Sequence, residues 1–268
     1  MIFKRSNGKR ISRGWLLVGL TVVFVIGSGA YFLTAGIRDT KKLEQTLIDR
    51  FGLAYTYTPS PDGSIAPERT EAFIRVRNAL QSACTSYQAV LAGIGGLDKL
   101  ESDQELSAGK SAKTGLKGFK SVFSIGPEMV AFVGRRNQAL LDENMGLGEY
   151  LYIYLTSYAE QLAAEPASAE PGMEEAYVSD RAREEYARIL ANQLLALETA
   201  GPADLAVNLR MELSALKDSL QTSPWPVVPA GKARESLAPY QEQLAGLYCS
   251  GIVRTELLQK NRGFQLDG

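Results

Sequence analysis

The clearest hydrophobic pattern in the chain is a run of 23 residues, 15–37, that contains no charged side chain. A helix of this length reaches about 34 Å at 1.5 Å per residue, which exceeds the thickness of a bilayer's hydrocarbon core, about 30 Å. The run therefore predicts a single transmembrane helix. Only basic charges precede it, and the positive-inside rule then predicts that the tail 1–14 is cytoplasmic and that the rest of the chain is exported. The basic residues before the run are Lys4, Arg5, Lys9, Arg10 and Arg13.

A cleaved signal peptide is the alternative interpretation of the same run. Ser28-Gly29-Ala30 resembles a small-residue cleavage site that follows a short apolar stretch. The apolar character continues to Ile37, which is too far for an ordinary signal sequence and favours an uncleaved anchor. Both interpretations place the bulk of the protein outside the cytoplasm. The expected location is the inner (plasma) membrane, with one membrane pass and a periplasmic or other extracytoplasmic body.

Further along the chain, apolar residues recur every three or four positions, which is the period of a buried helical face. The sequence predicts an all-α fold in which a bundle of about five or six helices occupies residues 67–258. A membrane-proximal helix and a Pro/Gly-rich loop are expected in 38–66, and a frayed tail in 259–268. The helices expected in the bundle cover 67–96, 127–162, 181–198, 202–220 and 232–258, and the third and fourth are expected to form an antiparallel hairpin.

The stretch 127–162 is the most ambiguous of these helices. Val133, Leu140, Leu147 and Tyr154 lie seven residues apart, which is typical of a coiled-coil-like seam in one helix of about 35 residues. Gly146 and Gly148, however, are positions at which the helix can bend or divide. The alternation within residues 150–154 also fits a β-strand, but a lone strand has no pairing partner in this sequence, so a helix is preferred.

Composition excludes several function classes. The chain contains no histidine, so Ser-His-Asp and Cys-His catalysis and histidine-ligated zinc are excluded. Of the 29 basic residues, five precede the apolar run, which leaves 24 against 30 acidic residues in the exported part. The resulting charge of −6 argues against a nucleic-acid partner. No catalytic residue, cofactor site or metal site is predicted.

The two cysteines, Cys84 and Cys249, lie too far apart in sequence for a CxxC motif. In an oxidising compartment such a pair favours a disulfide. The alternative is two buried free thiols that act as small apolar side chains. Sequence leaves both interpretations open.

Polar and aromatic residues in the helices suggest where an interaction face or a ligand cavity could lie. The candidates are Asn137, Asn144, Tyr150, Tyr154, Tyr158 and Trp225. The two asparagines either hold a partner helix or line a cavity, or else face water. The tyrosines either form a binding surface or fill the core. Trp225 either anchors its proline-rich segment or is an exposed recognition residue.

The hypothesis favoured by these patterns is a membrane-anchored, non-catalytic helical interaction or assembly protein of a bacterial-type cell envelope. Its partners would be the membrane, through residues 15–37, and an envelope protein or a second copy of the chain. An extracytoplasmic small-ligand-binding or sensory bundle that acts through a partner is the alternative. A carboxylate-dependent glycan enzyme is the third, because Glu101-Ser102 and Glu235-Ser236 resemble the Glu-Ser pair of helical lytic transglycosylases.

Overall fold

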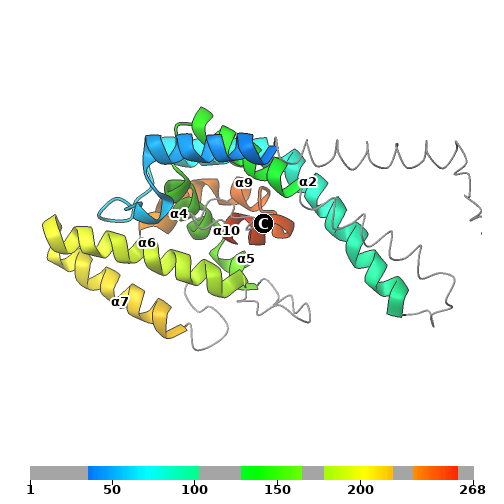
Figure 1. Ribbon diagram of the computed structural model, residues 1–268. Coiled ribbons are helices and arrows are strands. Elements are labelled where there is room, and N and C mark those ends of the chain that lie inside the picture. Colours follow the sequence, from blue (N-terminus) through cyan, green and yellow to red (C-terminus); the bar gives the residue numbers. More distant parts are fainter. Residues whose placement is uncertain (1–35, 103–127, 165–177, 220–231, 259–268) are drawn as a thin grey trace, which may run out of the picture.

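The computed structural model describes residues 36–102, 128–164, 178–219 and 232–258 (Figure 1). Within these ranges the regular structure is helical and no strand occurs, so the predicted all-α class is confirmed for them. The predicted membrane span 15–37, except for its last two residues, lies outside the described ranges, as do the tails 1–14 and 259–268 and Trp225. No helix in the part that the structure describes combines the length and the apolar character needed to cross a membrane.

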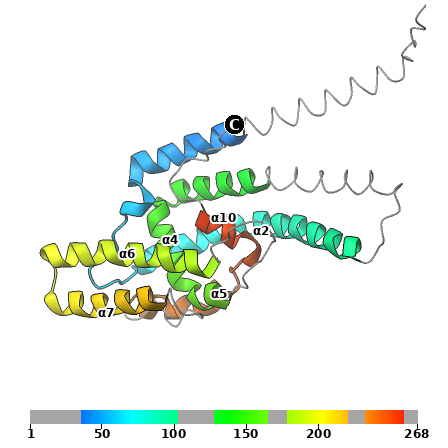
Figure 2. The ribbon, with the colours of Figure 1, turned by 60° about the horizontal axis from the view of Figure 1, so that its bottom comes forward.

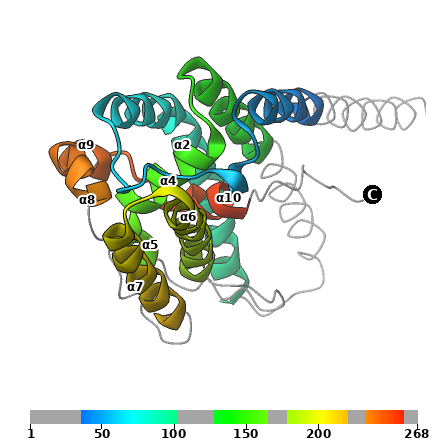
Figure 3. The ribbon, with the colours of Figure 1, turned by 90° about the vertical axis from the view of Figure 1, so that its left-hand side faces the viewer.

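Two helical segments, 36–51 and 128–142, are named here by their residue numbers. The other elements carry labels. In chain order these elements are η1 (Ala54–Thr56), α2 (Pro67–Ser102), α4 (Leu147–Ser157), α5 (Ala159–Ala164), α6 (Val178–Ala200), α7 (Ala203–Ser219), α8 (Lys232–Leu237), η2 (Ala238–Tyr240), α9 (Gln241–Ala245), η3 (Ser250–Ile252) and α10 (Val253–Leu258). The helices α4 and α10 lie in the middle of the body, surrounded by the longer ones (Figure 3).

Helix α2 is the longest element in the described part of the chain, with 36 residues. It begins at Pro67, which suits the first helical turn because that position needs no backbone N–H donor. Its buried face follows the helical period through Phe73, Val76, Leu80 and Cys84. The prediction that glycines end this helix near residue 96 was wrong, since the helix continues to Ser102.

The stretch expected as one helix over 127–162 is divided into three. Residues 128–142 form the first helix, and Asn144 follows it in the left-handed conformation with φ 51°. The N–H of Asn144 donates to the carbonyl of Leu141, and the N–H of Met145 donates to that of Leu140. This is a Schellman motif, which stops a helix. The predicted coiled-coil-like seam is therefore wrong, whereas the preference for helix over strand at residues 150–154 is confirmed.

Two glycines let the start of α4 lie directly against the end of helix 36–51 and the chain that follows it. A Cβ built on Gly146 would lie 2.9 Å from Cβ of Phe51. A Cβ built on Gly148 would lie 2.6 Å from the carbonyl oxygen of Ala54 and would also overlap Cβ of Tyr57. Residues with a side chain cannot approach the backbone this closely, so glycine is needed for packing here as well as for the break between helices.

Substitution of Gly148 by alanine is expected to lower the free energy of unfolding by roughly 1–3 kcal/mol, the range typical of overpacked sites. The added methyl group meets a backbone carbonyl, which cannot rotate away as a side chain could. Gly246→Ala is the matched control, because φ of Gly246 is −68° and the nearest atom to its built Cβ is 3.6 Å away. Urea unfolding of both variants would measure the difference. Equal stabilities would contradict the close approach of α4 and η1.

Helices α6 and α7 form the predicted antiparallel hairpin and lie side by side in all three views (Figures 1, 2 and 3). The connection is short, and Gly201 donates its N–H to the carbonyl of Leu197 at 2.7 Å. The single helix expected over 232–258 is not present. Pro239, at the start of η2, lacks the N–H that a continuing helix needs, and the chain divides into α8, η2, α9, η3 and α10.

Candidate functional site

Two arginines and one glutamate meet in the centre of the domain. Arg77 of α2, Arg136 of helix 128–142 and Glu256 of α10 are each at most 2% exposed. Nη1 of Arg77 donates to Oε1 of Glu256 at 2.7 Å, and Nη1 of Arg136 donates to Oε2 at 3.4 Å. Three helices that are distant in sequence are thus joined through one carboxylate.

Neutral polar groups add further hydrogen bonds to this cluster, although Nε of Arg77 is buried without a hydrogen-bond acceptor. The hydroxyl of Tyr150 accepts from Nη1 of Arg77 at 2.9 Å and donates to Oε1 of Glu256 at 2.7 Å. Nη2 of Arg77 donates to the carbonyl oxygen of Leu247 at 2.8 Å. Burial raises the pKa of Tyr150 above its ordinary value, so this phenol remains a protonated donor. Buried charges are tolerated only when they are paired and hydrogen-bonded in this way.

Aromatic rings enclose the guanidinium of Arg77. Its central carbon lies 5.3 Å from the ring centroid of Tyr154 and 5.6 Å from that of Tyr158, distances at which a cation is attracted to the ring face. Both tyrosines are fully buried. Burial raises the pKa of both phenols. These rings therefore belong to the packed core and hold Arg77 in place.

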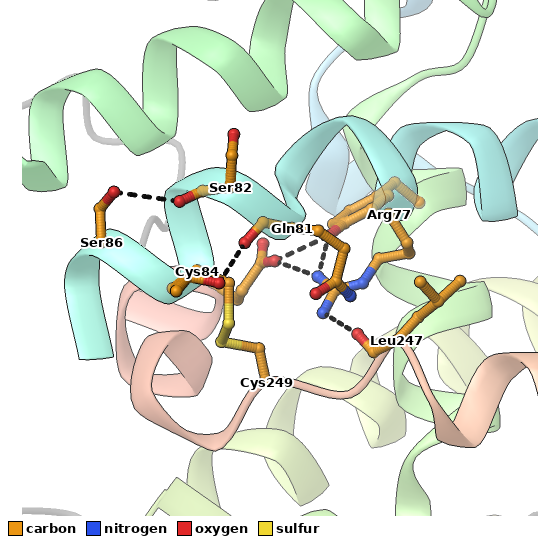
Figure 4. Close-up of a disulfide and its surroundings, with 10 residues drawn as sticks. Arg77, Gln81, Ser82, Cys84, Ser86, Leu247 and Cys249 are labelled. Atoms are coloured by element: carbon orange, nitrogen blue, oxygen red, sulfur yellow. Dashed lines mark hydrogen bonds and ion pairs between the residues drawn. A yellow bond between two sulfur atoms is a disulfide. The ribbon is translucent and has the colours of Figure 1, made fainter. Parts of the chain in front are cut away.

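A disulfide between Cys84 and Cys249 lies next to the charged cluster (Figure 4). The two Cα atoms are 6.3 Å apart, within the usual range for a disulfide. Cys84 lies two helical turns after Arg77 on α2, and Cys249 lies two residues after Leu247, whose carbonyl binds Arg77. The disulfide and the ionic cluster thus connect the same two segments, and the predicted cysteine pairing is confirmed.

The cluster has the composition of a catalytic site, but its geometry suits a structural role. The two oxygens of Glu256 each accept from an arginine, and the glutamate side chain is inaccessible to solvent. A catalytic acid or base must reach a substrate within hydrogen-bond distance. The cost of removing two cations and one anion from water is offset here by their mutual hydrogen bonds and by those to Tyr150 and Leu247. The cluster is therefore a central joint between α2, helix 128–142, α4 and α10.

Of the residues predicted as an interaction or ligand face, the structure places four in the core and one at a helix end. Tyr150, Tyr154 and Tyr158 are core residues, and Asn137 is buried with its Oδ1 accepting from Nη2 of Arg136 at 3.1 Å. Asn144 is exposed, ends a helix, and offers its carbonyl oxygen to Nη2 of Arg69 at 3.1 Å. The two asparagines therefore share no seam. Trp225 lies outside the described residues, so its predicted role stays a prediction.

Sequence analysis missed Arg77, Arg136 and Glu256. A signal was present for Arg77, because it occupies the same helical stripe as Phe73, Val76 and Leu80. A charged residue on an apolar stripe indicates a buried ion that needs a partner. Glu256 follows Ile252 and Val253 in the same manner. What the sequence could not provide is the pairing of positions 179 residues apart.

Among the residues that the structure describes, two cavities lie away from this cluster. One, of about 160 Å³, is bounded by α6, α7, α8 and the 61–63 turn, with Tyr186 and Glu212 among its lining residues. The other, of about 200 Å³, lies between the end of α4, α5, α8 and α9. Neither includes Asn137, Tyr150 or Tyr154, the residues that the ligand-binding alternative would place in a cavity. Both are smaller than typical ligand pockets, which measure roughly 300–1,000 Å³.

The Pro61-Asp62-Gly63 turn at the first cavity is tied to α8. Gly63 adopts φ 74°, and its N–H donates to the carbonyl of Ser60 at 2.9 Å. Asp62 accepts from the hydroxyl of Ser64 at 2.7 Å and from Nζ of Lys232 at 2.9 Å. The hydrogen bond from the Ser64 side chain, followed by that from Lys232, lowers the pKa of Asp62 below its usual range. The predicted turn is confirmed.

The lowered pKa of Asp62 makes part of the stability depend on pH. A carboxylate with a lower pKa in the folded state stabilises the protein above its unfolded pKa, about 3.9, and this stabilisation is lost as pH falls through the folded pKa. We expect Asp62→Asn to be less stable than the wild type at neutral pH and this gap to narrow progressively as pH falls below about 4. Urea unfolding of both proteins between pH 2 and 7 would test this, and a gap that does not change with pH would contradict it.

No cluster of three or more potential metal-binding side chains occurs within the described ranges. In the Glu235-Ser236 pair, Oγ of Ser236 accepts a hydrogen bond from the N–H of Ile65 at 3.2 Å. Glu235 is exposed. The side chains of Glu101 and Ser102 lie outside the described part.

Comparison of the chain with models of known protein families, with curated proteins and with solved structures finds no match.

Proposed function

We propose that this chain is a membrane-anchored, non-catalytic helical protein of a bacterial-type cell envelope that assembles with a protein partner. The uncharged run 15–37 supports the anchor. The disulfide supports an exported body, because disulfides persist in oxidising compartments.

The observation that carries the proposal is the distribution of charged and apolar side chains. The ionisable groups at the centre of the domain are sealed and paired with one another, as a structural joint requires. Large apolar side chains lie outside instead, on the α6–α7 hairpin. Val207 and Met211, which lie one turn apart on α7, are 49% and 60% exposed, and Leu195 of α6 is 67% exposed. Neighbouring exposed apolar side chains, such as Val207 and Met211, support contact with another protein.

Capture of the full-length protein from membranes tests this function. Photo-crosslinking followed by affinity capture in mild detergent is expected to recover a discrete partner, or a second copy of the chain. The variant Met211→Asp should lose that partner, since it places a charge among the apolar side chains. Gln243→Asp is the matched control, because Gln243 is exposed on α9, outside the hairpin. Recovery of no partner by the wild type would rule out the assembly role.

A further inference from the structure

The helical segments 36–51 and 128–142 run parallel and side by side (Figures 1 and 2). A Cβ built on Gly36 would lie 3.4 Å from Cγ1 of Val130, and one built on Gly134 would lie 3.2 Å from Oγ1 of Thr40. Further along, Gly146 meets Phe51. The offset between contacting residues stays at 94 or 95 through all three contacts, which fixes the parallel direction and the register.

This register sets the height of helix 128–142 relative to the predicted membrane span. Residues 36 and 37 are the last residues of the uncharged run and already belong to helix 36–51. Val130 contacts Gly36, so with the proposed anchor it lies level with the end of the uncharged run. At 1.5 Å per residue, Glu128 lies about 3 Å further toward the bilayer. The C-terminal part of α2 extends toward the same side of the molecule (Figures 1 and 2).

Basic and acidic side chains both lie at this end, since Glu44 and Glu128 stand near the basic residues. Arg38, Lys41 and Lys42 are exposed within two turns of Gly36. The nearby Asp39 lies 3.9 Å from Nζ of Lys42 and offsets one of these charges. Basic side chains close to a membrane surface are attracted to anionic headgroups, whereas acidic ones such as Glu128 are repelled by them.

We propose that the start of helix 128–142 contacts the lipid headgroups of the membrane that anchors the chain. The inference rests on the proposed anchor at residues 15–37. The lipid surface is then a second binding partner of the domain, contacted by a segment more than 90 residues after the span. The domain stands on the bilayer in one orientation, with the α6–α7 connection at the opposite end of the body (Figure 1).

Depth-dependent quenching on the full-length protein tests this contact. The protein is reconstituted into phosphatidylcholine/phosphatidylglycerol vesicles that contain a headgroup spin-labelled lipid. A fluorophore is attached to a single introduced cysteine in Ala131→Cys, Gln138→Cys or Ala203→Cys, without reductant so that the native disulfide stays closed. Ala131 and Gln138 are both exposed and lie seven residues apart on one helix face, which places the control about 10 Å further from the lipid. Ala203 is exposed at the start of α7.

Quenching is expected to be several-fold stronger at residue 131 than at residue 138, and weakest at residue 203. Equal quenching at the three positions, in protein that floats with the vesicles and resists carbonate extraction, would overturn the headgroup contact while leaving the anchor intact. Protein that fails to float would instead remove the anchor, and the headgroup contact with it. Loss of the contrast between residues 131 and 138 in vesicles without phosphatidylglycerol would show that anionic headgroups hold the domain upright.

Discussion

Replacement of Glu256 by glutamine is expected to lower the free energy of unfolding by roughly 3–5 kcal/mol, the loss typical when one partner of a buried ion pair is removed. Glu256 is the carboxylate that Arg77 and Arg136 share, and both arginines are almost completely buried. Without the carboxylate charge, the guanidinium groups keep their desolvation cost but lose the anion that offsets it. Urea unfolding of the detergent-solubilised full chain, followed by tyrosine fluorescence and circular dichroism, would measure the loss.

Glu242→Gln is the control for this change. It removes one carboxylate of the same type, but from the exposed face of α9, where substitutions usually change stability by less than about 0.5 kcal/mol. A loss for Glu256→Gln below about 1 kcal/mol, the value typical of exposed ion pairs, would show that water reaches the cluster and that it is not a sealed joint.

Removal of the disulfide is the second change with a large expected effect. The double variant Cys84→Ala/Cys249→Ala should lose about 5 kcal/mol in the chain-entropy model, because a cross-link over a loop this long restricts the unfolded chain strongly. The two cysteines are 165 residues apart, so the cross-link closes most of the described domain into one loop. Denaturant unfolding with and without dithiothreitol would measure the effect.

The reductant provides an internal control. Dithiothreitol should lower the stability of the wild type toward that of the double variant and should leave the double variant unchanged. The oxidised wild type should also migrate faster than the reduced form in a denaturing gel. Identical unfolding midpoints for the oxidised wild type and the double variant would contradict a stabilising cross-link.

These two effects should not be independent. Arg77 and Cys84 lie on one face of α2, and their partners Leu247 and Cys249 are two residues apart. Groups that share a contact region usually show coupling energies of about 0.5–3 kcal/mol. A variant that combines Glu256→Gln with loss of both cysteines should therefore depart from additivity.

The predicted parts of the fold depended on local patterns. The stripe on α2, the hairpin of α6 and α7 with Gly201 between them, and the Pro61-Asp62-Gly63 turn each follow from residues close together in sequence. Local patterns did not predict where two of the helices end. Asn144 fitted a heptad but ends a helix, and a helix expected to end near residue 96 continues to Ser102.

The candidate site was predicted less well than the fold. The pairing of Cys84 with Cys249 was one of two interpretations that composition left open. The tyrosines at positions 150, 154 and 158 were named as a possible surface but pack around Arg77 instead. A helical period indicates which residues share a face, but it cannot show whether that face meets solvent, lipid or another helix.

By itself, the sequence determined the helical class, the uncharged run at 15–37, the absence of histidine chemistry and the presence of a cysteine pair. Only the tertiary structure decided which charges meet, and it joined Arg77 to Glu256 and brought helix 128–142 level with residue 36. The physical reason is that hydrophobic periodicity acts over a few residues, whereas buried charges and the register of packed helices depend on segments that approach only after the chain has folded.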